Sequence, residues 1–148
     1  MNLTKLILPL ALVIFFPTCE RDTRLTLSDR NPPRFKMSGS GKLAMLRMHG
    51  PRVRDVQGEE AFIIWEIVPK EGRFNGTRIE DLSPITYGEV PPGYVQIYPE
   101  KGNAPALVEG ESYDAFVDTV NANGATAYFT IRGGKVVEKD FRGVEISR

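Results

Sequence analysis

Acidic side chains and a single histidine are the residues of this 148-residue chain that could perform acid–base or metal chemistry. His49 is followed by Gly50-Pro51, which indicates a loop after a strand. Glycosidase carboxyl groups must lie about 5–10 Å apart in a cleft, a distance that spacing along the chain does not determine. We expect most acidic groups to lie on solvated strand faces. The carboxylates that could include an acid–base pair or a calcium site are Glu59, Glu60, Glu109, Glu111, Asp114 and Asp118.

The sequence lacks the motifs in which such residues usually act as catalysts or bind a metal or phosphate. One histidine cannot build a zinc site of the usual kind, and no Asp-x-Asp-x-Asp-Gly calcium loop occurs. A Ser-His-Asp triad assembles in space rather than in sequence, but no Gly-x-Ser-x-Gly elbow accompanies His49. Residues 38–42 (Ser-Gly-Ser-Gly-Lys) lack the first glycine and the final Ser or Thr of a phosphate-binding loop, so they indicate a turn. The sequence therefore predicts no catalytic residue, metal or cofactor, and a protein that is not an enzyme.

Three tyrosines are the candidate ligand-contacting residues: Tyr87, Tyr94 and Tyr98. They flank a Val-Pro-Pro-Gly turn, and tyrosine combines an apolar ring with a hydroxyl suited to sugars or peptides. Recognition often lies on loops carried by a rigid scaffold. The alternative is that Tyr94 and Tyr98, an even number of residues apart, pack inward from one strand face while Tyr87 caps the adjacent strand.

Cys19, the only cysteine, directly follows a short apolar segment. Lys5 precedes the apolar run from Leu6 to Phe16, which has the length of the hydrophobic part of a signal peptide. The run is too short to span a bilayer, which takes about 20 apolar residues, and Glu20-Arg21-Asp22 ends it. A lone cysteine forms no disulfide within the chain, so its position is what carries information.

This arrangement resembles the export signal of bacterial lipoproteins. The resemblance implies cleavage before Cys19, lipidation of that residue, and attachment to a membrane of the cell envelope, facing the periplasm or the cell surface. Glu20, rather than aspartate, follows the cysteine and favours the outer membrane. Phe16-Pro17-Thr18 departs from the aliphatic-small-Gly/Ala/Ser pattern of the family. Ordinary cleavage nearby and an uncleaved N-terminal anchor therefore stay open as alternatives.

The chain divides into a signal peptide (1–18), a polar tether (19–34) and one domain (35–148). The tether is charged and ends in Pro32-Pro33, a composition that buries too little apolar surface to order itself. Removal of residues 1–18 leaves 18 basic and 19 acidic groups, a net charge near −1. Nucleic-acid binding calls for a clustered basic surface, so we expect no nucleic-acid partner.

The domain is predicted to be all-β. Short apolar segments alternate with Gly, Pro and Asn turns, which is typical of an antiparallel β-sandwich, here with about seven strands. In Ala61–Val68, Trp65 is expected on a buried face and Glu66 on a partly solvated one. Thr77–Leu82 could form one short helical turn. The predicted strands are Phe35–Met37, Leu43–Met48, Ala61–Val68, Ile85–Tyr87, Tyr94–Tyr98, Ser112–Val120, Thr126–Arg132 and Lys135–Glu138.

Two segments resemble the fibronectin type III family. The residues Ile63-Ile-Trp-Glu-Ile-Val-Pro69 resemble the second strand of that family, with its core tryptophan and following proline. Leu107-Val-Glu-Gly-Glu-Ser-Tyr113 resembles its tyrosine-corner segment, although Glu109 and Glu111 replace residues that are often Pro and Thr. The resemblance covers roughly residues 40–132. It implies a sandwich in which Trp65 and Tyr113 are core residues, and a binding or spacer module without catalytic residues.

Two functions follow. The first is a non-catalytic binding or assembly module, held at the membrane by the lipid on Cys19, with an envelope protein or a glycan as partner. The alternative is an envelope hydrolase or carbohydrate-active protein that uses surface carboxylates near Tyr87–Tyr98. A histidine close to an acid, or paired carboxylates in a cleft, would support the alternative.

Overall fold

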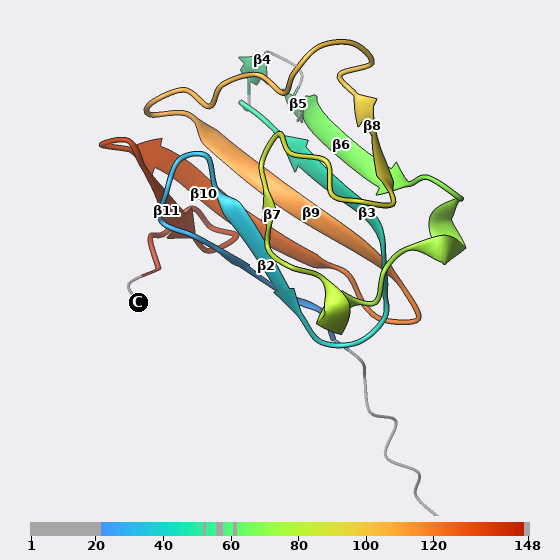
Figure 1. Cartoon of the computed structure of the whole chain (residues 1–148). Coiled ribbons are helices and arrows are strands. Elements are labelled where there is room, and N and C mark those ends of the chain that lie inside the picture. The colour runs from blue at the N-terminus through green and yellow to red at the C-terminus, as the bar shows by residue number, and fades with distance from the viewer. Residues whose placement is uncertain (1–21, 52, 56–57, 61, 147–148) are drawn as a thin grey trace, which may run out of the picture.

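Two antiparallel sheets pack face to face in the computed structural model (Figure 1). It describes residues 22–51, 53–55, 58–60 and 62–146, without the side chains of 53–55 and 58–60. The predicted signal peptide and Cys19 lie outside the described residues. The all-β sandwich predicted from the sequence is confirmed. Within the described part, no helix is long and apolar enough to cross a membrane.

The smaller sheet has the order β1-β2-β7 and the larger sheet the order β11-β10-β9-β3-β6-β8. The smaller sheet contains β1 (Arg24–Leu27), β2 (Arg34–Ser38) and β7 (Ile85–Thr86). The larger sheet contains β3 (Lys42–His49), β6 (Ile63–Pro69), β8 (Tyr94–Tyr98), β9 (Ser112–Val120), β10 (Ala125–Arg132) and β11 (Lys135–Lys139). A separate hairpin joins β4 (Val53–Asp55) to β5 (Gly58–Glu60), and two 3-10 turns, η1 (Arg73–Asn75) and η2 (Ile79–Asp81), follow β6.

The segment predicted as a tether is partly a strand of the sandwich. β1 pairs with β2, with Leu27 opposite Phe35, and an isolated bridge joins Asp22 to Asn123. Leu25 and Leu27 alternate with polar residues, and Leu27 is buried. This period of two lets a short edge strand bury one face in spite of its charged composition. The domain therefore begins by residue 22, not at residue 35.

An aromatic cluster joins the two sheets. Trp65 of β6 is fully buried, stacks on Phe35 of β2 at 6.2 Å between ring centroids, and meets Tyr87 edge-on at 5.5 Å. Tyr113 of β9 stacks on Phe129 of β10. The prediction that Trp65 and Tyr113 are core residues is confirmed. The resemblance implied that Trp65 lies on the second strand of the domain. It lies instead on β6, a strand of the larger sheet that follows both β1 and β2 in the chain.

Candidate functional site

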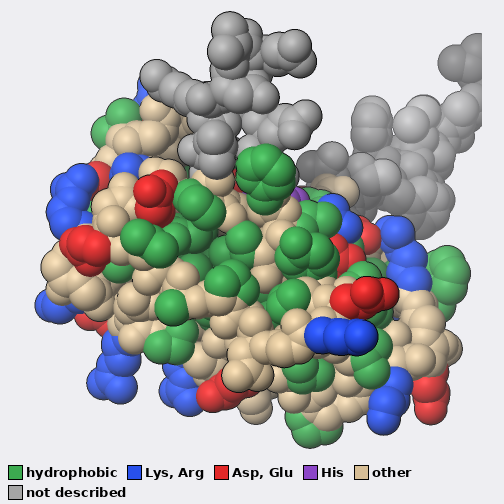
Figure 2. Space-filling view, turned by 90° about the horizontal axis from the view of Figure 1, so that it is seen from above, with side chains coloured by type: hydrophobic (Ala, Val, Ile, Leu, Met, Phe, Trp, Pro, Cys, Tyr) green, Lys and Arg blue, Asp and Glu red, His purple; other side chains and the backbone are tan. Residues whose placement is uncertain are grey.

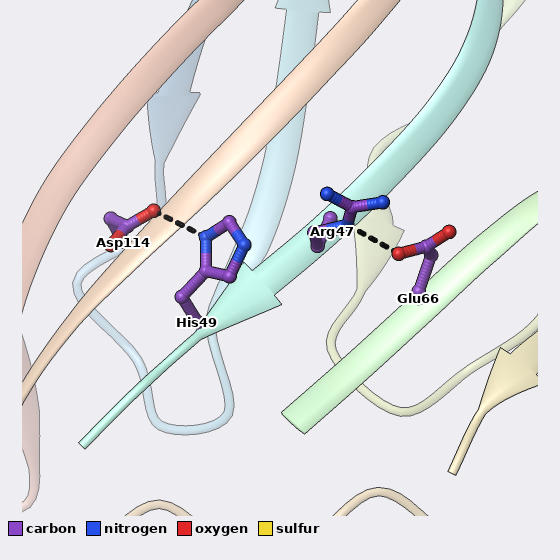
Figure 3. A network of polar contacts seen from close by, with 4 residues as sticks. All are labelled: Arg47, His49, Glu66 and Asp114. Carbon is purple, nitrogen blue, oxygen red and sulfur yellow. Dashed lines mark hydrogen bonds and ion pairs between the residues drawn. The ribbon is translucent and has the colours of Figure 1, made fainter. Parts of the chain in front are cut away.

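A row of paired ionisable side chains crosses the larger sheet near one end of the sandwich. Arg47 and His49 are two residues apart on β3, so their side chains leave the same face of the sheet. His49 faces Asp114 on β9, and Arg47 faces Glu66 on β6 (Figure 3). The Nδ1 atom of His49 lies 2.8 Å from Oδ2 of Asp114, and Arg47 forms an ion pair with Glu66. We call these four residues the polar row.

Both carboxylates of the polar row are nearly buried although they lie on the outer face of the sheet. Glu66 is 5% exposed and Asp114 is 7% exposed. The face of Glu66 is partly solvated as predicted, since Ile64 and Val68 on it are partly exposed, but Glu66 itself is buried. Burial of an unpaired carboxylate is costly, and the ion pair with Arg47 offsets that cost. Tyr98 lies opposite Glu66 in the β6–β8 register and flanks it on the other side.

An apolar groove adjoins the polar row where β3 ends and β6 begins. Its volume is about 520 Å³. Two of its aromatic side chains are largely open to solvent, with Phe62 51% exposed and Tyr98 46% exposed. Hydrophobic side chains gather on this end of the molecule (Figure 2). The groove is lined by Gly50, Pro51, Phe62, Ile63, Ile64, Tyr98, Pro99, Lys101, Asn103 and Pro105.

Gly50 connects the polar row to the groove. Its φ of 135° lies in the region that favours glycine, and a Cβ there would come within 2.6 Å of the Tyr113 ring. Only glycine therefore allows the chain to turn from His49 at the end of β3 into the groove at Pro51. The buried ring of Tyr113 and the open groove are thus held next to each other by one backbone turn.

The three candidate tyrosines do not form one site. Tyr87 is buried and its hydroxyl donates to the carbonyl of Pro105 at 2.8 Å. Tyr94 is also buried, and its hydroxyl donates to the Leu43 carbonyl and accepts the Thr77 N–H. Only Tyr98 lines the groove. The structure thus brings one of the three to a surface site and places the other two in the core.

A β-bulge separates Tyr98 from Tyr94. Ile67 pairs with Gln96, whereas the preceding residue, Glu66, pairs with Tyr98, so the register shifts by one residue. A shift of one residue turns a side chain to the opposite face of a strand. The inward packing of Tyr94 agrees with the alternative prediction, and the bulge explains why Tyr98 does not follow it. Gln96 instead points inward and accepts the Trp65 indole N–H at 3.1 Å.

Burial raises the pKa of two core tyrosines, Tyr87 and Tyr113. Burial is the main cause that raises the pKa of Tyr87, and the nearby Tyr113 adds to it. The pKa of Tyr113 is also raised, mainly by burial, against the opposing effect of the hydrogen bond that its hydroxyl accepts from the Val108 N–H. A raised pKa keeps the phenol protonated, so Tyr87 remains a hydrogen-bond donor to Pro105.

The other candidate carboxylates are scattered. Asp118 pairs with Arg73 at 2.9 Å, and Glu109 accepts the N–H groups of Gly133 and Gly134 in the β10–β11 turn. The side chains of Glu59 and Glu60 lie outside the described residues. Among the described side chains, no group of three or more His, Cys, Asp or Glu residues could hold a metal ion. Of these carboxylates, the structure brings Asp114 to His49.

The pairing of His49 with Asp114 has chemical consequences. When the carboxylate is ionised it is only an acceptor, so a neutral imidazole that pairs with it donates from Nδ1 and keeps Nε2 as its acceptor nitrogen. That is how an orienting acid acts on the histidine of a catalytic triad. In the described part of the chain, no serine, threonine or cysteine side chain hydrogen-bonds to His49. Sequence reasoning missed this pair because 65 residues separate its members, and only the β3–β9 register brings them together.

No family model, curated protein or solved structure matches this chain.

Proposed function

We propose that this protein is a lipid-anchored protein of the bacterial cell envelope whose sandwich serves as a non-catalytic binding or assembly module. The observation that carries the proposal is the apolar groove, because it lies at the opposite end of the sandwich from the start of the domain. Exposed aromatic side chains that line a concavity are typical of a recognition site. The partner is an envelope protein or a glycan.

The β3 strand measures the separation between the two ends. At its start, Lys42 lies opposite Val120, close to the turn where Asp22 bridges to Asn123. At its end, His49 lies opposite Asp114 beside the groove. Seven residue steps at about 3.4 Å each give a length of about 24 Å. A lipid on Cys19 would therefore attach to one end and leave the groove at the other, facing away from the membrane.

The strand order supports a fibronectin type III or immunoglobulin-like sandwich. In immunoglobulin-type domains strands A, B and E share one sheet, and C, F and G share the other. The orders β1-β2-β7 and β3-β9-β10 correspond to these, with β6, β8 and β11 extending the larger sheet. Tyr113, near the start of β9, accepts the Val108 N–H at 2.8 Å, as a tyrosine corner does. The position of Trp65 on β6 departs from the family.

Membrane attachment is tested by substitution of the proposed lipid site. The full-length protein is expressed in bacteria with a radiolabelled fatty acid, beside the Cys19→Ser variant. We expect the label and the membrane fraction to be lost together in the variant, because removal of the acyl chain removes the anchor. A variant that stays in the membrane fraction would contradict lipid anchoring and would favour an uncleaved N-terminal anchor.

The second candidate function is that of an envelope hydrolase or carbohydrate-active protein. The observation that favours it is the His49–Asp114 pair beside the groove, together with Glu66 next to Tyr98. This function predicts that the purified protein cleaves an ester or glycoside from a chromogenic panel. The His49→Gln variant would then lose at least 100-fold in rate, the contribution typical of a general base. No turnover by the wild-type protein would rule against this function for the substrates in the panel.

A further inference from the structure

We infer that the apolar groove and the neighbouring edge of β8 receive an extended peptide segment of a second envelope protein, which adds as a strand to the larger sheet. The inference rests on the proposed function for the position of the groove relative to the membrane. Strand addition combines two elements of recognition: backbone hydrogen bonds along an exposed sheet edge, and a pocket that accepts alternate side chains. The described surface offers both at one place.

The two outer edges of the larger sheet differ. Beyond β11 the chain turns back, so that Glu145 bridges to Lys139 and the Ile146 N–H donates to the Glu138 carbonyl at 3.0 Å. This return segment covers the end of the β11 edge, and Asp29 and Arg30 cover its start through the Val136 N–H and the Lys135 bridge. At the other end of the strand order β8 is the last strand, and its final residues, Ile97 and Tyr98, are exposed. An edge strand presents backbone groups that another strand can pair with.

The groove begins where the β8 edge ends. Tyr98 belongs to both, and Pro99 continues from the strand into the lining. The lining is mainly apolar; Lys101 is its charged side chain and Asn103 its amide side chain. A glycan needs several polar partners, whereas an aliphatic or aromatic peptide side chain is matched by Phe62, Ile64 and the prolines. The chemistry of the lining therefore favours a peptide over a glycan.

The chain cannot fill this groove with its own N-terminus once residues 1–18 are removed. Three residues, Cys19 to Arg21, then precede the first described residue, Asp22. Three residues span at most about 11 Å, and the groove lies about 24 Å away along β3. A bilayer attached through Cys19 would lie at that same end of the domain, away from the groove. The mature N-terminus is therefore excluded as the occupant, and we take the occupant to be a segment of another molecule.

The test uses the full-length lipidated protein in detergent and a displayed library of random ten-residue peptides as the probe. The tightest peptide is synthesised in two forms, N-methylated at odd or at even positions. In an added strand, alternate residues point their N–H groups toward the edge. We expect one form to bind at least tenfold more weakly and the other to bind within twofold of the parent.

Matched variants locate the bound peptide. Phe62→Ser removes an exposed aromatic from the groove, and we expect it to weaken peptide binding at least tenfold. Phe141→Ser removes an exposed aromatic beyond β11, and we expect no change. The Cys19→Ser protein should bind the peptide as well as the wild type does, so loss of anchoring and loss of the groove are distinguished.

Four results of the peptide experiments would overturn the inference. They are a library that yields no binder, equal effects of the two methylation patterns, binding that survives Phe62→Ser, and a peptide displaced by purified peptidoglycan fragments. Wild-type protein that self-associates without peptide and becomes monomeric on Phe62→Ser would also contradict it, since a second copy would then occupy the groove.

Discussion

The two ends of the sandwich are built differently. At the end where the domain begins, β1 starts beside the end of β2, Thr23 is buried, and Asp22 bridges to the β9–β10 turn. At the other end, Phe62 and Tyr98 are exposed around a concavity. Phe74 is also exposed at the first end, where its carbonyl accepts a hydrogen bond from Lys42 Nζ, so the two ends differ in the groove that Phe62 and Tyr98 line and not in burial alone.

This difference assigns different roles to the two ends. If Cys19 carries the proposed lipid, strand β1 places the attachment point within a few residues of the folded domain, so the domain would stand on the membrane and not move on a long tether. Phe62 and Tyr98 at the far end are not part of the buried core cluster, although Ile64 of the same groove packs against it. Stability and recognition are thus separable, and substitutions can test that separation.

The largest effect is expected at Trp65, which forms the core beneath the groove. Trp65→Ala should destabilise the domain by about 3–5 kcal/mol because it removes a large, fully buried ring. Tyr98→Ala, on the exposed side of the same end, should change the free energy of unfolding by about 0.5 kcal/mol or less. Urea denaturation followed by fluorescence or circular dichroism measures both. Similar losses of unfolding free energy in the two variants would contradict the claim that the groove residues are separate from the core.

The next effect concerns the ordered N-terminus. Leu27→Ala should cost about 2 kcal/mol, at the low end for a buried leucine because β1 is an edge strand. Thr26→Ala, an exposed neighbour on the same strand, is the control and should be nearly neutral. Thermal unfolding of the two variants gives the comparison. If Leu27→Ala left stability unchanged, residues 24–27 would be a tether after all.

A smaller effect separates the two tyrosines of β8. Tyr94→Phe removes a hydroxyl that donates to the Leu43 carbonyl and accepts the Thr77 N–H, near the start of β3. Loss of one buried and one partly buried hydrogen bond should cost about 1–2 kcal/mol. Tyr98→Phe should have almost no effect on unfolding. Equal losses, measured by urea denaturation, would mean that Tyr98 also supports the core.

The smallest effect is a dependence of stability on alkaline pH. The pKa of Tyr87 is raised in the folded state by burial, while the unfolded chain ionises near the ordinary value of about 10. Above that pH the unfolded state binds fewer protons than the folded state, so stability falls as pH rises. Below it, the contribution is fully present. Tyr87→Phe should flatten the decline between about pH 10 and 11, with Tyr98→Phe as the matched control. A decline unchanged by Tyr87→Phe would contradict the assignment.

Sequence alone predicts the strands well and the site poorly. Tyr94–Tyr98 and Ser112–Val120 are strands with the predicted bounds, because their alternation and flanking turns are local features. Trp65 and Tyr113 follow from the same local patterns. The strand β1 was missed because its two leucines lie among charged residues. The exposure of Tyr98 depends on a bulge, and the His49–Asp114 pair depends on register, neither of which is written in neighbouring residues.

The orientation of the two ends on a membrane is the central claim, and energy transfer measures it most directly. With Cys19 acylated, a single introduced cysteine can be labelled without competition. Ser38→Cys places a donor dye at the anchor end, and Lys101→Cys places it at the groove. In vesicles with acceptor-labelled lipid, we predict efficient transfer from position 38 and clearly weaker transfer from position 101, consistent with a separation of about 24 Å along β3. Equal transfer from the two positions, or stronger transfer from position 101, would contradict the account.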